Sequence, residues 1–358
     1  MSLPFYGSHD VVLSDHAIDN LAKIKDLIAH KPSKLMVISD FDHTLTKFTS
    51  LQCHDVVGFN KRYSKEFLKE FNDIFLTPLA SLSEWWRVAH DLLVDKSGLT
   101  KEMLHERLSE EIVAVRDGLE EFIIDLRLHH IPLIIVSAGI RDVIAHTLAK
   151  CNLCIEHDEL FHIDANFLEF HDCGKLSNVL PEDPVHSESK KLVHVRAGHM
   201  FDFLTQTSEL SSDPVNPNSS NSYIVNASSE QDEEQIDLIV LEPDNATTTG
   251  TTRTTTENQQ ASTQSGENSD SSEVVIAIVL GDRSHDFAVL DAYPEVHTFR
   301  IGFARNNRPS DTADLLQAGH CDAVLVGEEH SLYPVHLLLQ DLIHCRLNSG
   351  HHTKTILK

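Results

Sequence analysis

The sequence lacks a long apolar run and has few basic residues for its length. No stretch approaches the roughly 20 apolar residues that a membrane-spanning helix needs. The N-terminus has no basic start followed by an apolar stretch, so we expect no signal peptide. Lys and Arg number 29 against 55 Asp and Glu, a formal net charge of −26. This charge would repel nucleic acid and anionic membranes, so we expect neither as a partner.

Cysteine is also sparse. The six cysteines lie at positions 53, 151, 154, 173, 321 and 345. They lack the density of a disulfide scaffold, and the CxxC at 151–154 has no second ligand pair that would indicate a metal site. We therefore expect a soluble protein of a reducing, cytoplasmic compartment.

Short apolar runs rich in β-branched residues predict four buried parallel strands. They cover 34–42, 131–139, 274–282 and 321–329. Helical patterns such as 117–130 and 141–151 lie next to these runs. Strands that alternate with helices are typical of α/β proteins with a Rossmann-like, doubly wound parallel sheet. In such a sheet the ligand site lies beyond the carboxyl ends of the strands.

Two long stretches interrupt this alternation. Residues 48–116 have helical periodicity and far exceed the dozen or so residues of a crossover, so we predict an inserted α-helical cap that can close over the site. Residues 205–272 are rich in Ser, Thr, Asn and Gln and predict a low-complexity, disordered insertion. The insertion could have no role, or could bind an unknown protein partner. The expected division is core 1–47, cap 48–116, core 117–204, insertion 205–272 and core 273–358.

The first predicted strand ends in the segment VISDFDHTLT, residues 37–46. Side chains two residues apart in an extended segment point the same way, so Asp40 and Asp42 should lie together. Like charges this close repel unless a cation lies between them or one takes up a proton. Asp282, at the end of the third predicted strand, should add a further carboxylate. Carboxylate oxygens suit Mg²⁺, which would also neutralise the charge of a phosphate ester.

These residue types predict phosphoryl-transfer chemistry. Asp40 can attack phosphorus to form an aspartyl-phosphate. Asp42 can give a proton to the leaving oxygen and then take one from the attacking water. Ser137, with the N–H groups of Ala138 and Gly139, precedes a predicted helix and forms a candidate anion site.

In this order, the motifs resemble those of the haloacid-dehalogenase superfamily, and most closely its cytosolic pyrimidine 5′-nucleotidase family. The matching elements are Asp40–Thr44, Glu84–Trp86, Ser137–Val143, Asn166–Phe167 with Phe170, Gly281–Asp282 with Asp286, and Ile301–Phe303. They extend over 1–204 and 273–358, and several motifs in the right order are far more specific than a lone DxDxT. The resemblance implies a Mg²⁺-dependent 5′-nucleotidase that hydrolyses nucleoside 5′-monophosphates, with pyrimidine ones such as CMP and UMP expected first.

The resemblance also implies roles for individual residues. Asp40 and Asp282 carry over as metal ligands through their side chains, and Asp42 carries over through its backbone carbonyl. The implied phosphate contacts are Thr44, Ser137, Ala138, Gly139 and Lys190. Asp286 is implied as a supporting residue.

Two alignments are open for the family's third motif, a lysine that neutralises phosphate charge. We prefer Lys190, because His186 precedes it at the expected spacing, with Lys191 next to it. The rival alignment on 192–199 leaves Arg196 to substitute for the lysine.

The cap departs from the family pattern and leaves the nucleobase preference open. Its shortened region at 71–82 has only Asp73 as an acidic candidate, and Ala89 stands where the family has a serine before a histidine. A site without such hydrogen-bonding groups discriminates poorly between bases. Trp85 and Trp86 could stack on a base or pack within the protein.

Two alternative functions therefore remain. One is a phosphatase or phosphotransferase acting on another small phosphomonoester. The other is a binding protein with weakened catalysis. The three retained carboxylates argue against the second, since a binding protein has no need of groups that repel one another.

Overall fold

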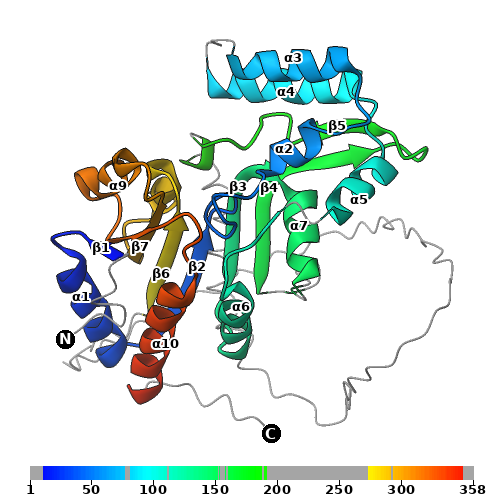
Figure 1. Ribbon diagram of the computed structural model, residues 1–358. Helices are drawn as coiled ribbons and strands as arrows, with labels where there is room; N and C mark the ends of the chain where they lie inside the picture. The colour runs from blue at the N-terminus through cyan, green and yellow to red at the C-terminus, as the bar shows by residue number, and fades with distance from the viewer. Residues whose placement is uncertain are drawn as a thin grey trace, which may run out of the picture. The chain divides into compact units, whose positions relative to one another are not determined.

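The computed structural model describes most of the chain outside the low-complexity segment (Figure 1). The described residues are 11–76, 81–110, 113–151, 153, 158, 160–187, 189–191, 273–291 and 293–349. The insertion predicted at 205–272 and the rival motif residue Arg196 lie outside them, and the side chain of Lys191 is not described.

Eight strands of the described residues form one sheet, in the order β1-β8-β7-β6-β2-β3-β4-β5. The strands are β1 (Val11–Leu13), β2 (Ser33–Ser39), β3 (Leu133–Ile140), β4 (Phe161–Phe170), β5 (Leu176–Leu180), β6 (Val274–Gly281), β7 (His297–Ala304) and β8 (Ala323–Val326). The strands from β8 to β4 pair in parallel, whereas β1 and β5 add antiparallel edges. The predicted α/β fold with a Rossmann-like parallel sheet is confirmed for the centre, and the four predicted strands are β2, β3, β6 and β8.

The central strands are buried because their apolar residues cover both faces of the sheet. β2 pairs with β3 on one side and β6 on the other, and Val37 and Ile278 are 0% and 2% exposed. Parallel strands covered on both faces carry near-continuous apolar runs, which is why the sequence pattern identified them. The N–H of Asp40 donates to the Leu280 carbonyl at 3.0 Å, so this pairing continues to the first candidate site residue.

Helices flank the sheet (Figure 1). They are α1 (Ala17–His30), α6 (Leu119–Leu128), α7 (Arg141–Lys150), α9 (Pro309–Leu316) and α10 (Tyr333–Asn348). Helix α10 packs against α1 and α6, α7 packs against β3 and β4, and α9 packs against β7 and β8. None of the helices in the described part of the chain combines the length and apolar character needed to cross a bilayer.

Four further helices occupy the stretch predicted to form the cap. They are α2 (Cys53–Gly58), α3 (Lys65–Leu76), α4 (Leu82–Lys96) and α5 (Lys101–Ser109). Ser81 and Thr100 are N-caps of α4 and α5, and each side chain accepts a backbone N–H of the first turn. The division into core and cap remains our proposal.

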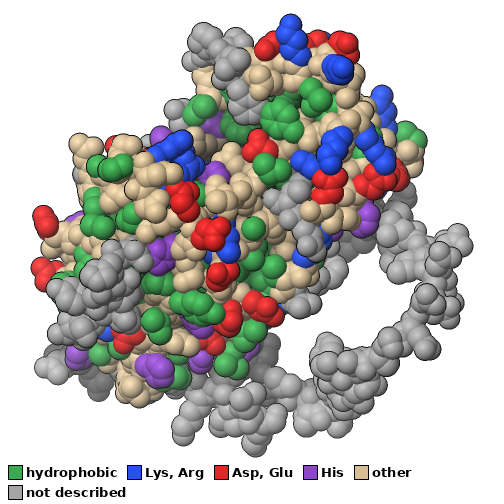
Figure 2. Space-filling view, viewed as in Figure 1, with side chains coloured by type: hydrophobic (Ala, Val, Ile, Leu, Met, Phe, Trp, Pro, Cys, Tyr) green, Lys and Arg blue, Asp and Glu red, His purple; other side chains and the backbone are tan. Residues whose placement is uncertain are grey.

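One connection was not predicted. The hairpin of β4 and β5 extends from the core sheet to the cap helices: α4 packs against β5, and the Lys101 N–H donates to the Gly174 carbonyl at 2.9 Å. Acidic and basic side chains are interspersed on the face in Figure 2, so the negative net charge is not gathered into one patch there.

Candidate active site

A cavity of about 150 Å³ lies at the carboxyl ends of β2, β3 and β6. Its core side is lined by Asp40, Asp42, Ser137, Lys190, Asp282 and Asp286. Ala138 and Gly139 also border it. Except for Thr44, all the candidate site residues named from the sequence therefore meet in one cavity.

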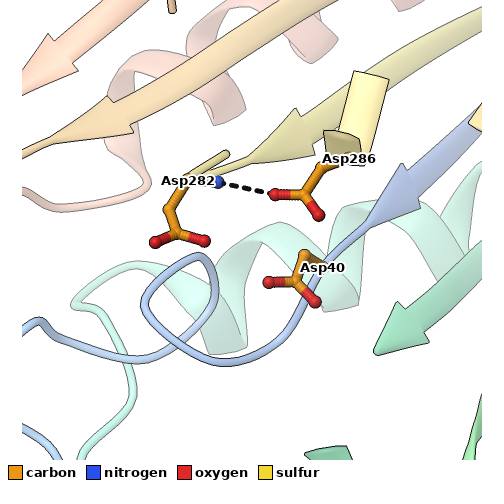
Figure 3. Close-up of side chains that lie close together, drawn as sticks. All are labelled: Asp40, Asp282 and Asp286. Atoms are coloured by element: carbon orange, nitrogen blue, oxygen red, sulfur yellow. Dashed lines mark hydrogen bonds between the residues drawn. The ribbon is translucent and has the colours of Figure 1, made fainter. Parts of the chain in front are cut away.

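Three of the carboxylates that line this cavity lie close together (Figure 3). One oxygen from each of Asp40, Asp282 and Asp286 lies within 4.8 Å of the others, and all three residues are at most 9% exposed. Asp286, on the short 3₁₀ helix η3 (Ser284–Leu290), accepts the N–H groups of Asp282 and Arg283 at 3.1 and 2.9 Å. A compact set of carboxylate oxygens is the donor set that a hard divalent cation such as Mg²⁺ requires, so the residues fit such an ion.

The buried carboxylates bind protons more tightly than exposed ones. Burial raises the pKa of Asp40 to about 6, although the Lys190 charge opposes the shift. Burial and the nearby Asp40 charge raise the pKa of Asp42 to about 7. Burial, with the charges of Asp286 and Asp40, raises the pKa of Asp282 well above its usual value. The site thus has more buried negative charge than its own cation neutralises, which favours a bound metal or a retained proton.

The positive charge within the site is the ammonium group of Lys190. Its Nζ donates to Asp40 Oδ1 at 2.8 Å and to Asp286 Oδ1 at 2.6 Å. Burial alone would lower the pKa of Lys190, but the charges of Asp286 and Asp40 more than offset this and raise it. Lys190 lies on the short 3₁₀ helix η1 (Ser189–Lys191), in a turn where the His186 N–H donates to Ser189 Oγ at 2.8 Å. The structure places it where the preferred alignment expects the third-motif lysine.

Asn166 joins the Ser137 loop to the segment that carries Lys190. Its Nδ2 donates to the carbonyls of Ala138 and Val185 at 2.8 and 2.9 Å, and its Oδ1 accepts the Val185 N–H at 2.8 Å. The sequence motif included Asn166 but assigned it no role. Its fully buried amide therefore fixes the distance between the Ser137 loop and the segment that carries Lys190.

Thr44 is the one candidate that does not line the cavity. Its side chain is fully buried, and its Oγ1 has no hydrogen-bond partner among the described residues. The phosphate contact implied for it by the resemblance remains a prediction.

Arg116 was missed by the sequence analysis, since a lone arginine before a predicted helix is usually a solvated charge. It is 1% exposed, and its guanidinium donates to the carbonyls of His43 at 2.6 Å, Thr44 at 2.8 Å and His330 at 2.8 Å. It also stacks on the Phe303 ring, 4.3 Å from the centroid. Arg116 thus anchors the loop that follows Asp42.

The predicted cap lines the cavity with uncharged and aromatic side chains in place of carboxylates. Gln52, His54 and Trp86 border the cavity, and the His54 and Trp86 ring centroids are 3.8 Å apart. His54 Nε2 lies 3.3 Å from His90 Nε2. Burial lowers the pKa of His54 well below its usual value and that of His90 to about 4, so this pair is neutral near pH 7.

The two tryptophans have different positions. Trp86 borders the cavity, whereas Trp85 Nε1 donates to the Ile74 carbonyl at 3.0 Å within the cap. Asp73, the sole acidic candidate for reading a base, is exposed on α3 and is not among the residues that line the cavity.

Comparisons with known proteins agree with the resemblance drawn from the motifs. The model of the family described as "Pyrimidine 5'-nucleotidase (UMPH-1)" matches residues 77–212. A 7-methylguanosine phosphate-specific 5'-nucleotidase B of Xenopus laevis is 28% identical over 210 residues, which cover 53% of this chain and 70% of that protein. The human 7-methylguanosine phosphate-specific 5'-nucleotidase is 30% identical over 162 residues, and the chain spans about half of its length, 53%.

Among solved structures, cytosolic 5'-nucleotidase IIIB bound to cytidine matches with a TM-score of 0.59 over 97% of each chain, at 17% identity. At that identity the match shows a shared fold. The matched family model, the sequence relatives and the fold together confirm the resemblance. The chain is an enzyme, a phosphoric monoester hydrolase, and over residues 77–212 it is similar to the pyrimidine 5′-nucleotidase family.

Proposed function

We propose that the protein hydrolyses nucleoside 5′-monophosphates to nucleoside and phosphate through an aspartyl-phosphate on Asp40. The observation that carries this proposal is the Lys190 ammonium held between Asp40 and Asp286 at the base of the cavity. A fixed cation beside a carboxylate nucleophile lowers the cost of bringing an anionic phosphate to it.

In the proposed first step an Asp40 oxygen forms a bond to phosphorus while the bond from phosphorus to the ribose 5′-oxygen breaks. Asp42 gives its proton to that departing oxygen, which its raised pKa of about 7 permits. In the second step Asp42 takes a proton from water, and the water oxygen displaces Asp40 from phosphorus. Ser137 and the loop at Ala138 and Gly139 bind the phosphate oxygens.

The proposed cofactor is Mg²⁺. Asp40 and Asp282 would hold it through their side chains and Asp42 through its backbone carbonyl, with Asp286 adjacent. When bound, the ion supplies neutralisation of the charges on the phosphate and the carboxylates.

For the base, we propose a pyrimidine, as in CMP and UMP. The description of the matched family model, a pyrimidine 5'-nucleotidase family, and the cytidine named with the structural relative support this choice. The names of the sequence relatives support a second candidate, 7-methylguanosine monophosphate. Trp86 and the neutral His54 are the cap groups available to either base.

We also propose a cytoplasmic location. The name of the structural relative, a cytosolic nucleotidase, supports it, as do the free thiols among the described cysteines. The role proposed for 205–272, to bind a protein partner, concerns residues outside the described ones.

Phosphate release from a panel of phosphomonoesters tests the proposal. The panel holds CMP, UMP, GMP, 7-methyl-GMP and a sugar phosphate, each with Mg²⁺ and with chelator. We expect nucleotides to exceed the sugar phosphate, CMP and UMP to exceed GMP, and chelator to abolish turnover. Faster release from the sugar phosphate would instead favour the alternative of a phosphatase for another small phosphomonoester.

A further inference from the structure

Among the described residues, Lys190 and Arg283 are the two basic side chains that line the cavity, and they are held differently. The side chain of Lys190 is 5% exposed, and its Nζ donates to Asp40 and Asp286. The side chain of Arg283 is 56% exposed, and its Nε lies 3.4 Å from Asp282 Oδ2. Lys190 is therefore an internal partner of the carboxylates, whereas Arg283 lies at the solvent side of the same cavity.

The backbone of Arg283 is fixed although its side chain is exposed. Its N–H donates to Asp286 Oδ2 at 2.9 Å, and its carbonyl accepts the Asp286 N–H at 3.1 Å. The preceding residue, Asp282, directly follows β6 and is 9% exposed. The guanidinium of Arg283 is therefore attached to a fixed point beside the cluster of carboxylates.

The chemistry of a guanidinium suits it to a phosphate group. It has five N–H donors in one plane, and this geometry matches two oxygens of a phosphate. Arg283 contacts Asp282 through Nε, which leaves roughly four N–H groups on its two outer nitrogens to bind a ligand. By contrast, Lys190 has only about three N–H groups, and Asp40 and Asp286 each accept a hydrogen bond from its Nζ.

The charge of the cavity gives a cation at its mouth a role. Four carboxylates line the cavity, those of Asp40, Asp42, Asp282 and Asp286, in a chain with a formal net charge of −26. This negative charge repels an approaching phosphate dianion. An exposed cation at the mouth attracts the dianion and raises its local concentration.

We propose that Arg283 is a substrate-binding residue whose guanidinium contacts the phosphate group of the nucleotide at the mouth of the cavity. This inference rests on the proposed function, in which that phosphate is transferred to Asp40. A contact that is made on binding and kept through the reaction stabilises the substrate and the transition state equally. Its loss should therefore raise KM and leave kcat little changed.

Arg283→Met tests the contact, because it removes the charge and keeps most of the apolar length of the side chain. At saturating Mg²⁺ we expect KM for CMP and the inhibition constant of inorganic phosphate each to rise about tenfold, with kcat within about twofold. Since the contact is with phosphate, KM for 4-nitrophenyl phosphate should rise by the same factor. Arg283→Lys keeps the charge without the planar set of donors and should recover part of the loss.

Arg62→Met is the matched control. The Arg62 side chain is 57% exposed and pairs with Glu106, and it does not line the cavity. This variant should leave both KM values and the inhibition by phosphate unchanged. Added NaCl should lower kcat/KM of the wild type and of Arg62→Met more steeply than that of Arg283→Met, because salt screens an exposed charge.

An unchanged inhibition constant for phosphate in Arg283→Met would overturn the inference. A rise in KM for CMP but not for 4-nitrophenyl phosphate would also overturn it, because the contact would then be with the nucleoside. Half activation at a lower Mg²⁺ concentration, with unchanged inhibition by phosphate, would show that Arg283 acts on Asp282 instead. The proposed function stands in all three cases, whereas a wild-type enzyme that releases phosphate from no nucleotide would overturn both.

Discussion

The two walls of the cavity are built in different ways. On the strand-end side, the buried Lys190 donates to the buried carboxylates of Asp40 and Asp286, and Asn166 and Arg116 hold the adjoining loops. On the cap side, the rings of His54 and the half-buried Trp86 border the cavity, and His54 Nε2 lies 3.3 Å from Nε2 of the buried His90. A site held by many buried polar contacts has one geometry, whereas a wall of aromatic rings can accept several flat ligands.

This difference separates the two parts of the function. In the proposed function, the strand-end wall carries the reaction that all substrates would share, and the cap wall selects among them. Changes to the first wall should therefore affect turnover of every phosphomonoester, and changes to the second should affect particular substrates only. Four predictions test this contrast, from the largest expected effect to the smallest.

Asp40→Asn should remove the nucleophile and lower kcat by at least about 10⁴-fold on all substrates. Steady-state phosphate release measures this, with circular dichroism to confirm folding. Asp26→Asn, at a side chain that is 73% exposed on α1, is the matched control and should retain wild-type activity. An Asp40→Asn enzyme with more than about 1% of wild-type kcat would exclude Asp40 as the nucleophile.

Arg116→Met should lower the free energy of unfolding by roughly 3–4 kcal/mol, because the buried carbonyls of His43 and Thr44 and the partly buried carbonyl of His330 lose their charged donor. Urea denaturation measures this loss. Arg62→Met, at a side chain that is 57% exposed, should change the same quantity by less than about 0.5 kcal/mol. Similar losses in both variants would show that Arg116 does not anchor the loop after Asp42.

The histidine pair should make stability depend on pH. The pKa of His90 is about 4 in the folded protein against an ordinary value of 6.5, so the unfolded chain takes up the proton first as the pH falls. The resulting stabilisation is complete above pH 6.5 and declines toward pH 4 by up to about 3 kcal/mol.

Urea denaturation from pH 7.5 to pH 4.5 measures this effect as the difference between wild type and His90→Asn. The difference should shrink as the pH falls, because only the wild type has His90 to protonate. The exposed His171→Asn should follow the wild-type curve throughout. A pH-independent difference for His90→Asn would contradict the neutral pair.

Trp86→Ala should raise KM for CMP by about tenfold, since loss of stacking costs roughly 1 kcal/mol or more, and should leave kcat within about twofold. Trp85→Ala should lower the melting temperature instead, because its indole donates within the cap. If Trp86→Ala also lowered kcat on every substrate, the cap side and the strand-end side of the cavity would not have separate roles in base binding and turnover.

Several features could be predicted because they depend on neighbours in the sequence. Buried strands such as β2 and β6 are continuous apolar runs, and the aspartates that follow them are adjacent along the chain. Lys190 could be placed by its spacing from His186, which forms the same turn. Local patterns carry this information because a strand or a turn is specified over a few residues.

Other features depend on distant partners. Arg116 contacts the Thr44 carbonyl 72 residues away, and Asn166 joins Ala138 and Val185 across 28 and 19 residues. The antiparallel edges β1 and β5 were also unforeseen, since short strands have little pattern of their own. No local composition indicates which buried carbonyls will need a donor.

The sequence by itself therefore determined the α/β core and the strand-end carboxylates at Asp40, Asp42 and Asp282. Apolar periodicity and the ends of parallel strands dictate both. Only the tertiary structure decided that Asp286 and Lys190 form one ion cluster with Asp40, that the Cys53 backbone N–H donates to Asp42, and that Trp86 and not Trp85 borders the cavity. Those outcomes depend on how the cap helices and the sheet pack, and packing is settled by contacts between segments far apart in the chain.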